Sequence, residues 1–159
     1  MEKMEFHTVR GYQLLEKNKK LLTSAMEDYL EMIYRNSGPD GFLRTNKLAE
    51  LLHVKASSAS KMVRKLGELG LLKYEKYGVI TLSEEGKEIG KYLLNRHNVI
   101  EEFLKTIGIR ENILLETELI EHNVSSMTLR NINILIRFLM SNPEILKKFE
   151  EFKTAYREE

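Results

Sequence analysis

The chain has 159 residues, of which 42% are hydrophobic and 31% are charged, and its formal net charge is +1. This length suits one domain or two small ones with real hydrophobic cores. The absence of cysteine excludes a disulfide framework and a thiolate metal site. Because no apolar run approaches the roughly 18 residues of a membrane span, and no signal-peptide core opens the chain, we expect a soluble cytoplasmic protein without a membrane partner.

Charge is unevenly distributed along the chain. Residues 44–81 contain eight Lys and Arg against three Glu, a local charge of +5. Residues 82–122 contain five Lys and Arg against nine Glu, a local charge of −4. A basic block followed by an acidic one indicates that two parts of the chain have separate functions.

The first third of the chain contains one clear helical pattern. Residues 1–20 mix charged with scattered apolar residues, and this pattern leaves open whether they form a short helix or stay loose. From Leu21 to the turn-forming segment 37–41 the spacing predicts a helix. Asp28 and Glu31, three residues apart, fall together on the polar side of this helix.

Two short helices with a brief link between them are predicted next. The first covers Thr45–Leu52, and the second runs from Ser57 or Ser58 to about Gly70. The second helix places apolar residues on one side and small, hydroxyl-bearing and basic residues on the other. This pattern is typical of a helix-turn-helix, whose second helix enters the major groove of DNA.

Residues 71–82 follow as two short β-prone runs around a Gly-containing turn. A hairpin directly after a helix-turn-helix makes a winged helix with a two-stranded wing. The candidate DNA contacts are Ser57, Ser58, Ser60, Lys61, Arg64 and Lys65 on the helix and Lys76 and Tyr77 in the wing. A winged helix used for protein contacts is the alternative, and the local charge of +5 favours DNA.

The second half of the chain is predicted to be entirely helical. A start signal at Ser83 opens a long helix that ends near Gly108. Further helices are expected over residues 114–124, over residues 128–140 and, after the break at residues 141–143, in the last segment.

One helical segment of this half combines acidic residues with a histidine. At 100° per residue, Glu118, Glu121 and His122 share one arc, whereas Leu119 and Ile120 lie on the apolar side. Two carboxylates and an imidazole on one face are a candidate half-site for a divalent metal ion. Taken alone, such charges are more often solvated. We expect this arc to lie outside the hydrophobic cores.

Several motifs in order carry a resemblance to a known family. They are residues 24–34, 57–63, 74–77, 86–91, 96–97 and 118–122. Over roughly residues 23–140 the chain resembles the diphtheria toxin repressor family of metal-dependent transcriptional repressors, and most closely its shorter manganese transport regulator branch. The resemblance implies a homodimeric repressor of metal-uptake genes, in which metal fixes the DNA-binding domains relative to the dimer core.

In the manganese branch the metal ligands occupy positions that all carry ligand-competent side chains here. They are Asp28, Glu31, His97, Glu118, Glu121 and His122. The resemblance therefore implies Mn²⁺ as the cofactor and Fe²⁺ as the alternative; Co²⁺, Zn²⁺ or Cd²⁺ can occupy such a site in vitro. Because six side chains are more than one ion usually needs, we expect a pair of ions per subunit. The iron-sensing branch usually carries a methionine in place of Asp28, a cysteine in the later cluster and a further C-terminal domain. This chain has Asp28 and no cysteine, and we expect no further C-terminal domain in its 159 residues.

We therefore expect a mainly α-helical protein of three parts. These are an N-terminal extension (residues 1–20), a winged-helix DNA-binding domain (21–84) and a helical metal-binding and dimerisation domain (85–159), without an SH3-like third domain. The expected partners are a palindromic double-stranded DNA operator and a second copy of the chain. Two alternatives stay open: an iron-responsive regulator of the same family, and a winged-helix regulator with no metal switch. A binuclear metallohydrolase is remote because no phosphate loop or nucleophile motif accompanies the ligands, so we expect no enzyme.

Overall fold

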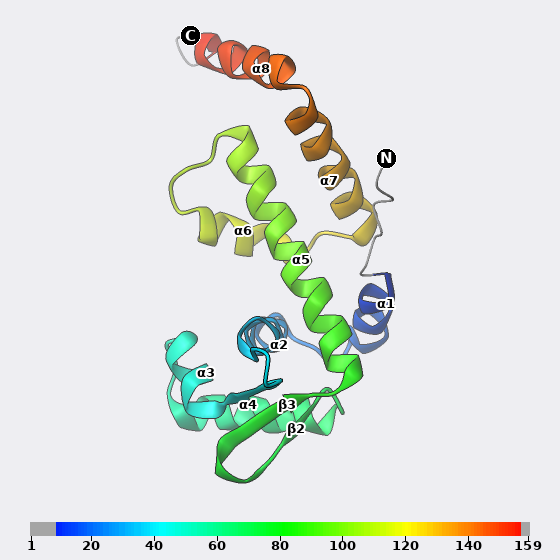
Figure 1. Ribbon diagram of the computed structural model, residues 1–159, viewed down its shortest axis with the longest axis vertical. Coiled ribbons are helices and arrows are strands. Elements are labelled where there is room, and N and C mark those ends of the chain that lie inside the picture. The colour runs from blue at the N-terminus through cyan, green and yellow to red at the C-terminus, as the bar shows by residue number, and fades with distance from the viewer. Residues whose placement is uncertain (1–8, 157–159) are drawn as a thin grey trace. The chain divides into compact units, whose positions relative to one another are not determined.

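Helices and a small sheet make up residues 9–156, the part of the chain that the computed structural model describes. The first eight residues of the predicted extension lie outside this part. In chain order the elements are α1 (Val9–Asn18), α2 (Ser24–Asn36), β1 (Phe42–Arg44), α3 (Thr45–Leu51), α4 (Ala56–Glu68), β2 (Leu72–Tyr74), the 3₁₀ turn η1 (Lys76–Gly78), β3 (Val79–Leu82), α5 (Glu84–Ile107), α6 (Ile113–Glu121), α7 (Ser126–Ser141) and α8 (Pro143–Tyr156) (Figure 1). They form two compact units that divide between Asn95 and Arg96, within α5. No helix of the described residues is long and apolar enough to cross a membrane.

The helix-turn-helix of the first unit consists of α3 and α4, and α2 packs on both. The buried side of α4 carries Ala59, Val63 and Leu66, each with an exposed fraction of 0%. Burying three apolar side chains on one face fixes the rotation of α4 and turns its polar face outward. The predicted helix-turn-helix is therefore confirmed, with α4 beginning at Ala56, slightly earlier than expected.

The wing is the antiparallel hairpin of β2 and β3, in which Leu72 pairs with Leu82. Its tip is η1, as the turn pattern predicts. The sheet also contains β1, which the sequence did not predict and which pairs with β3 through Leu43 and Ile80. The predicted two-stranded wing is therefore confirmed, but it is part of a three-stranded sheet in the order β1-β3-β2.

Helix α5 begins at a predicted cap and packs closely on its neighbours in the first unit. Ser83 caps the helix as predicted, because its hydroxyl accepts a hydrogen bond from the N–H of Gly86 at 3.0 Å. Two glycines then permit the close packing. A Cβ at Gly86 would lie 1.9 Å from the carbonyl oxygen of Leu71, and a Cβ at Gly90 would lie 2.6 Å from the Cβ of Tyr34. Only a residue without a side chain permits these approaches.

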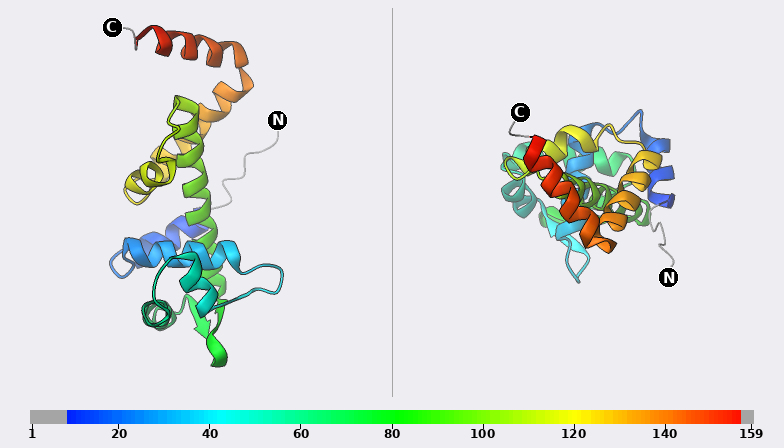
Figure 2. Two further views of the ribbon diagram at one scale, coloured as in Figure 1. Left: turned by 90° about the vertical axis from the view of Figure 1, so that its left-hand side faces the viewer. Right: turned by 90° about the horizontal axis from the view of Figure 1, so that it is seen from above.

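The second unit contains the rest of α5 together with α6, α7 and α8. Gly108 ends α5 with a φ of +100°, as its position predicts. The predicted break after α7 is also present, and α8 leaves it at an angle to α7, beginning at Pro143 (Figure 2). The ammonium group of Lys153 in α8 donates a hydrogen bond to the carbonyl of Ile107 at 3.2 Å, which satisfies a free carbonyl at the end of α5.

Candidate metal centre and nucleic-acid interface

The outward side of α4 is the candidate DNA-reading surface. It carries the predicted contacts, of which Ser60 is half-buried and the others are exposed: Ser57, Ser58, Ser60, Lys61, Arg64 and Lys65. Hydroxyl and basic groups on an exposed helix face can bind base edges and phosphates in a major groove. The geometry of α4 is therefore suited to the predicted role.

The wing tip carries the other predicted contacts, Lys76 and Tyr77. Tyr77 has a φ of 64° and an exposed fraction of 90%. The tip is held against the start of α3: the hydroxyl of Thr45 donates to the carbonyl of Gly78 at 3.0 Å, and the guanidinium of Arg44 donates to the carbonyl of Tyr77 at 3.4 Å. A cavity of about 270 Å³ lies here, lined by these residues and by Asn46, Ser60 and Tyr74. Sequence reasoning missed the contacts of Arg44 and Thr45 with the wing because it did not find β1.

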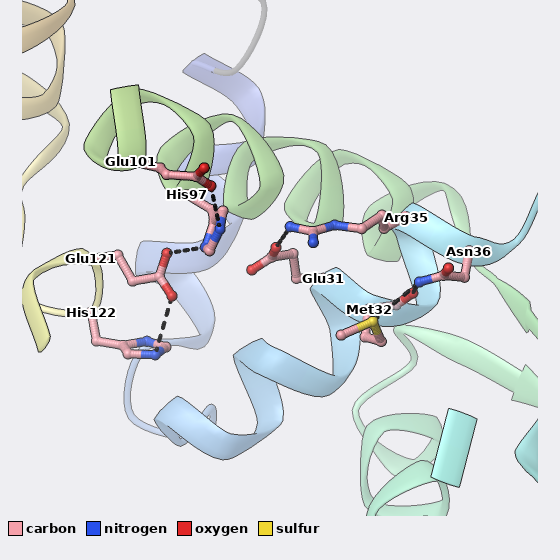
Figure 3. A network of polar contacts seen from close by, with 8 residues as sticks. All are labelled: Glu31, Met32, Arg35, Asn36, His97, Glu101, Glu121 and His122. Carbon is pink, nitrogen blue, oxygen red and sulfur yellow. Dashed lines mark hydrogen bonds and ion pairs between the residues drawn. The ribbon is translucent and has the colours of Figure 1, made fainter. Parts of the chain in front are cut away.

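Three of the predicted metal ligands lie together in the second unit. His97 comes from α5, Glu121 ends α6, and His122 follows as its C-terminal cap residue. The Nδ1 of His97 lies 3.0 Å from a carboxylate oxygen of Glu121, and the Nε2 of His122 lies 3.8 Å from the other oxygen (Figure 3). These residues form a histidine–carboxylate–histidine cluster.

The cluster is also held by a basic neighbour on α5. A guanidinium N–H of Arg96 lies 3.2 Å from the Nδ1 of His122. Because arginine can donate but not accept, this contact makes the Nδ1 of His122 the acceptor and leaves the Nε2 to carry the proton of the neutral ring. The Nε2 is the nitrogen that lies nearer to Glu121.

Sequence reasoning missed Glu101, which is a further neighbour of the cluster. Its carboxylate lies 3.3 Å from the Nε2 of His97, one helical turn earlier on α5. Lys105, one turn later, hydrogen-bonds to the same carboxylate and holds the pKa of Glu101 below its ordinary value. The spacing His-x-x-x-Glu was a usable signal, since residues four apart face each other on a helix. Partners of this kind orient the imidazole of a metal ligand.

The donor chemistry of the cluster fits a first-row divalent metal. The carboxylate of Glu121 is buried, with an exposed fraction of 2%. A buried carboxylate is costly unless cations or donors surround it, and the imidazoles supply that surrounding here. Nitrogen and oxygen donors suit Mn²⁺ or Fe²⁺, and closed thiolate zinc chemistry is excluded without cysteine.

The orientation of α6 differs from our expectation. Glu121 and Thr117 are buried, whereas Leu115 and Leu119 have exposed fractions of 54% and 62%. The arc expected to lie outside the cores therefore contains a buried ligand, and Glu118 on the same arc is exposed. The expectation was wrong because it used only the apolar residues to predict the buried face. In the structure the carboxylate of Glu121 is buried against the imidazole of His97, with 3.0 Å between its oxygen and Nδ1.

The remaining predicted ligands, Asp28 and Glu31, lie on α2 in the first unit. They are three residues apart and so share a side of that helix. Glu31 forms an ion pair with Arg35 one turn later (Figure 3). Each unit thus contributes its own group of candidate ligands.

The comparisons with known proteins cover both units. The family model of the iron dependent repressor N-terminal DNA-binding domain matches residues 21–80, and that of the iron dependent repressor metal-binding and dimerisation domain matches residues 83–150. The HTH-type transcriptional regulator MntR of Lysinibacillus sphaericus (strain C3-41) is 42% identical over 135 residues, which are 84% of this chain and 97% of that protein. MntR of Oceanobacillus iheyensis (strain DSM 14371 / CIP 107618 / JCM 11309 / KCTC 3954 / HTE831) is 39% identical over 81% of this chain and 88% of that protein.

Solved structures agree with this relationship. A manganese-dependent transcriptional repressor in complex with manganese is 33% identical, with a TM-score of 0.63 over 71% of this chain. The manganese regulator SloR is 30% identical, with a TM-score of 0.62 over 71% of this chain. The chain spans about half the length of these solved chains, 53% and 54% respectively. The chain therefore belongs to the iron-dependent repressor family of metal-dependent transcriptional repressors, which bind DNA and are not enzymes.

Proposed function

We propose that the protein is a Mn²⁺-activated repressor that binds a palindromic operator of metal-uptake genes. The observation that carries this proposal is the cluster of the buried residues His97 and Glu121 with the half-buried His122, in a chain whose relatives are named MntR. Manganese is favoured over a thiolate-type metal by the nitrogen and oxygen donors. The exposed basic face of α4 supports the DNA-binding half of the proposal.

The proposed ligand set joins residues of both units. Asp28 and Glu31 come from the DNA-binding unit, and the others come from the second unit: His97, Glu118, Glu121 and His122. Four carboxylates and two imidazoles are more donors than one ion needs, so we propose that these residues would hold a pair of ions per subunit. These residues would hold Mn²⁺ through their carboxylates and imidazoles, and the bound cation would supply positive charge that compensates the carboxylates.

The switch follows from the charge of this ligand set. Without a cation, the four carboxylates repel one another and lose hydration when they are brought together. This repulsion favours separation of α2 from the acidic second unit. When bound metal compensates these charges, the ligands would hold the DNA-binding unit in a fixed position. The metal would act by reducing the flexibility of this unit as well as by moving it.

A fixed position matters because we propose that two copies bind the operator together. The matched domain is described as a dimerisation domain, and α7 within it exposes Met127, Ile134, Leu135 and Phe138. A groove of about 390 Å³ beside them is lined mainly by apolar side chains of α5 and α7. If this surface pairs with a second copy, the two α4 helices must be spaced to fit half-sites roughly 34–36 Å apart.

Titration of operator DNA with and without metal tests the proposal. The operator would first be selected from a random DNA pool in the presence of Mn²⁺. Mn²⁺ is expected to tighten binding of this DNA, and the double variant Glu118→Ala with His122→Ala should lose the response. Operator binding of normal strength in a chelator would contradict the metal switch.

An iron-responsive regulator is the second candidate, because both matched family models describe iron-dependent repressors. Fe²⁺ accepts the same donors as Mn²⁺. Parallel titrations with Mn²⁺, Fe²⁺, Co²⁺ and Zn²⁺ separate these cases. A response to Fe²⁺ at lower concentration than to Mn²⁺ would favour iron.

A further inference from the structure

Helix α1 lies outside the segment that the family model matches, which begins at residue 21. The sequence left open whether this part of the chain is helical, and the structure shows a helix packed on the first half of α5 within the first unit (Figure 1). Leu15 faces inward with an exposed fraction of 6%. The extension therefore has a defined docking place.

The middle of α1 docks through a close backbone approach. A Cβ at Gly11 would lie 2.4 Å from the carbonyl oxygen of Glu88 and 2.8 Å from the Cβ of Tyr92. Any larger residue would force the two helices apart. The ring of Tyr12 lies against the ring of Tyr92, with 5.6 Å between centroids, and Tyr92 has an exposed fraction of 1%. Tilted aromatic pairs at this distance are attractive beyond the area they bury.

The C-terminal end of α1 is held by a buried amide. Asn18 has an exposed fraction of 8%, and its side-chain NH₂ donates to the carbonyl of Leu14 at 2.9 Å and to the carboxylate of Glu85 at 3.1 Å. A buried amide with two partners fixes the position of the helix end, since losing either partner leaves a polar group unsatisfied. Glu85, Glu88 and Tyr92 lie near one side of α5, so α1 follows that side.

The connection from α1 to α2 is short and hydrogen-bonded. The carbonyl of Asn18 accepts from the N–H groups of Leu21 and Leu22 at 2.8 and 2.9 Å. The hydroxyl of Thr23 then caps α2 by accepting from the N–H of Met26 at 3.2 Å. The position of α1 therefore determines where α2 begins.

The other end of α2 also packs on α5, because Gly90 of α5 has no side chain and Tyr34 of α2 lies directly against it. Both ends of α2 are thus fixed to one helix, the first through α1 and the second directly. Between these ends lie Asp28 and Glu31, and α5 itself continues to His97. Holding ligand-bearing helices in place before binding reduces the entropy lost when a ligand orders them.

From these contacts we infer that α1 is a positioning element that fixes α2, and with it Asp28 and Glu31, on α5. This inference rests on the proposed metal-binding function. Gly11, Tyr12 and Asn18 are its positioning residues, and none of them belongs to the proposed ligand set. Because α2 is already fixed, the protein reaches half-saturation with Mn²⁺ at a lower Mn²⁺ concentration.

The full-length double variant Tyr12→Ala with Asn18→Ala tests the inference. We expect half-saturation with Mn²⁺, measured by calorimetry, to require an about fivefold higher concentration than in the wild type. In the metal-free protein, amide hydrogen exchange should become faster in α1 and in the first turns of α2. Tyr12→Phe, which keeps the ring contact, should restore wild-type behaviour, and Gln13→Ala on the exposed side of α1 is the matched control.

Unchanged Mn²⁺ affinity in a double variant whose α1 exchanges rapidly would overturn the inference. If circular dichroism shows that the double variant is unfolded, the Mn²⁺ affinity of Tyr12→Ala alone is compared with that of Tyr12→Phe. A wild-type protein that binds no Mn²⁺ would instead contradict the proposed function, which is a different result.

Discussion

His97 has a carboxylate next to each of its ring nitrogens, Glu121 at 3.0 Å from Nδ1 and Glu101 at 3.3 Å from Nε2. These neighbours fix the plane and rotation of the ring before any ligand arrives. Glu101 was not predicted because it is one of several glutamates on α5, and only the structure shows that its carboxylate lies against His97. At this scale the sequence predicted which residues are candidate ligands. It could not predict the contacts that orient the ring of His97, because these depend on where α6 places Glu121.

The charge of Glu121 is the most direct test at the scale of single residues. Glu121→Gln keeps the size and shape of the side chain but removes its negative charge and replaces one acceptor oxygen by a donor NH₂. We expect Mn²⁺ affinity to fall at least about tenfold, since even outer partners of metal ligands contribute this much. Calorimetric titration measures the effect, and Glu111→Gln at an exposed position is the control for loss of one charge. Equal affinity in both variants would remove Glu121 from the ligand set.

At the scale of elements, local signals predicted most of what the structure contains. The cap at Ser83, the stop at Gly108 and the break before Pro143 act within one helical turn, so they can be read from neighbouring residues. Strand β1 could not be predicted in this way, because three residues become a strand only through pairing with β3. The buried face of α6 could not be predicted locally either, because it includes a contact between Glu121 and His97, which is 24 residues away on another helix.

The close passage of α5 at its N-terminal end gives a stability prediction. In Gly86→Ala the new Cβ would lie 1.9 Å from the carbonyl of Leu71, so the helix must shift. We expect the free energy of unfolding to fall by about 1–3 kcal/mol, measured by chemical denaturation. Gly67→Ala is the matched control, because its Cβ would have its nearest neighbour at 3.7 Å and Ala favours a helix. A destabilisation no larger than in this control would show that α5 does not need the close approach.

The polar face of α4 gives a prediction about DNA. Replacing Lys61 and Arg64 together by Ala should weaken operator binding while Mn²⁺ affinity stays unchanged. If both contact phosphates, the slope of log affinity against log salt should fall by about 2. Lys147→Ala with Lys148→Ala on α8 removes the same charge from exposed positions of the second unit. An equal loss of operator affinity in this control would mean that overall charge, and not the α4 face, binds DNA.

At the scale of the whole molecule, the sequence predicted a mainly helical chain with a winged helix, and the fold and family confirm both. Periodicity and turn formers were sufficient for that because they determine the type and order of elements. The metal ligands came from the resemblance to a family, since residues as far apart as Asp28 and His122 carry no local signal of a shared site.

The most direct measurement is the affinity of the full-length protein for its selected operator in chelator and in saturating Mn²⁺. Coupling between two ligands of a protein commonly changes affinity 5- to 150-fold. We expect Mn²⁺ to tighten operator binding by at least about tenfold, and the Glu118→Ala, His122→Ala double variant to show no such gain. Equal operator affinity in chelator and in Mn²⁺ would contradict the central claim that metal binding controls DNA binding.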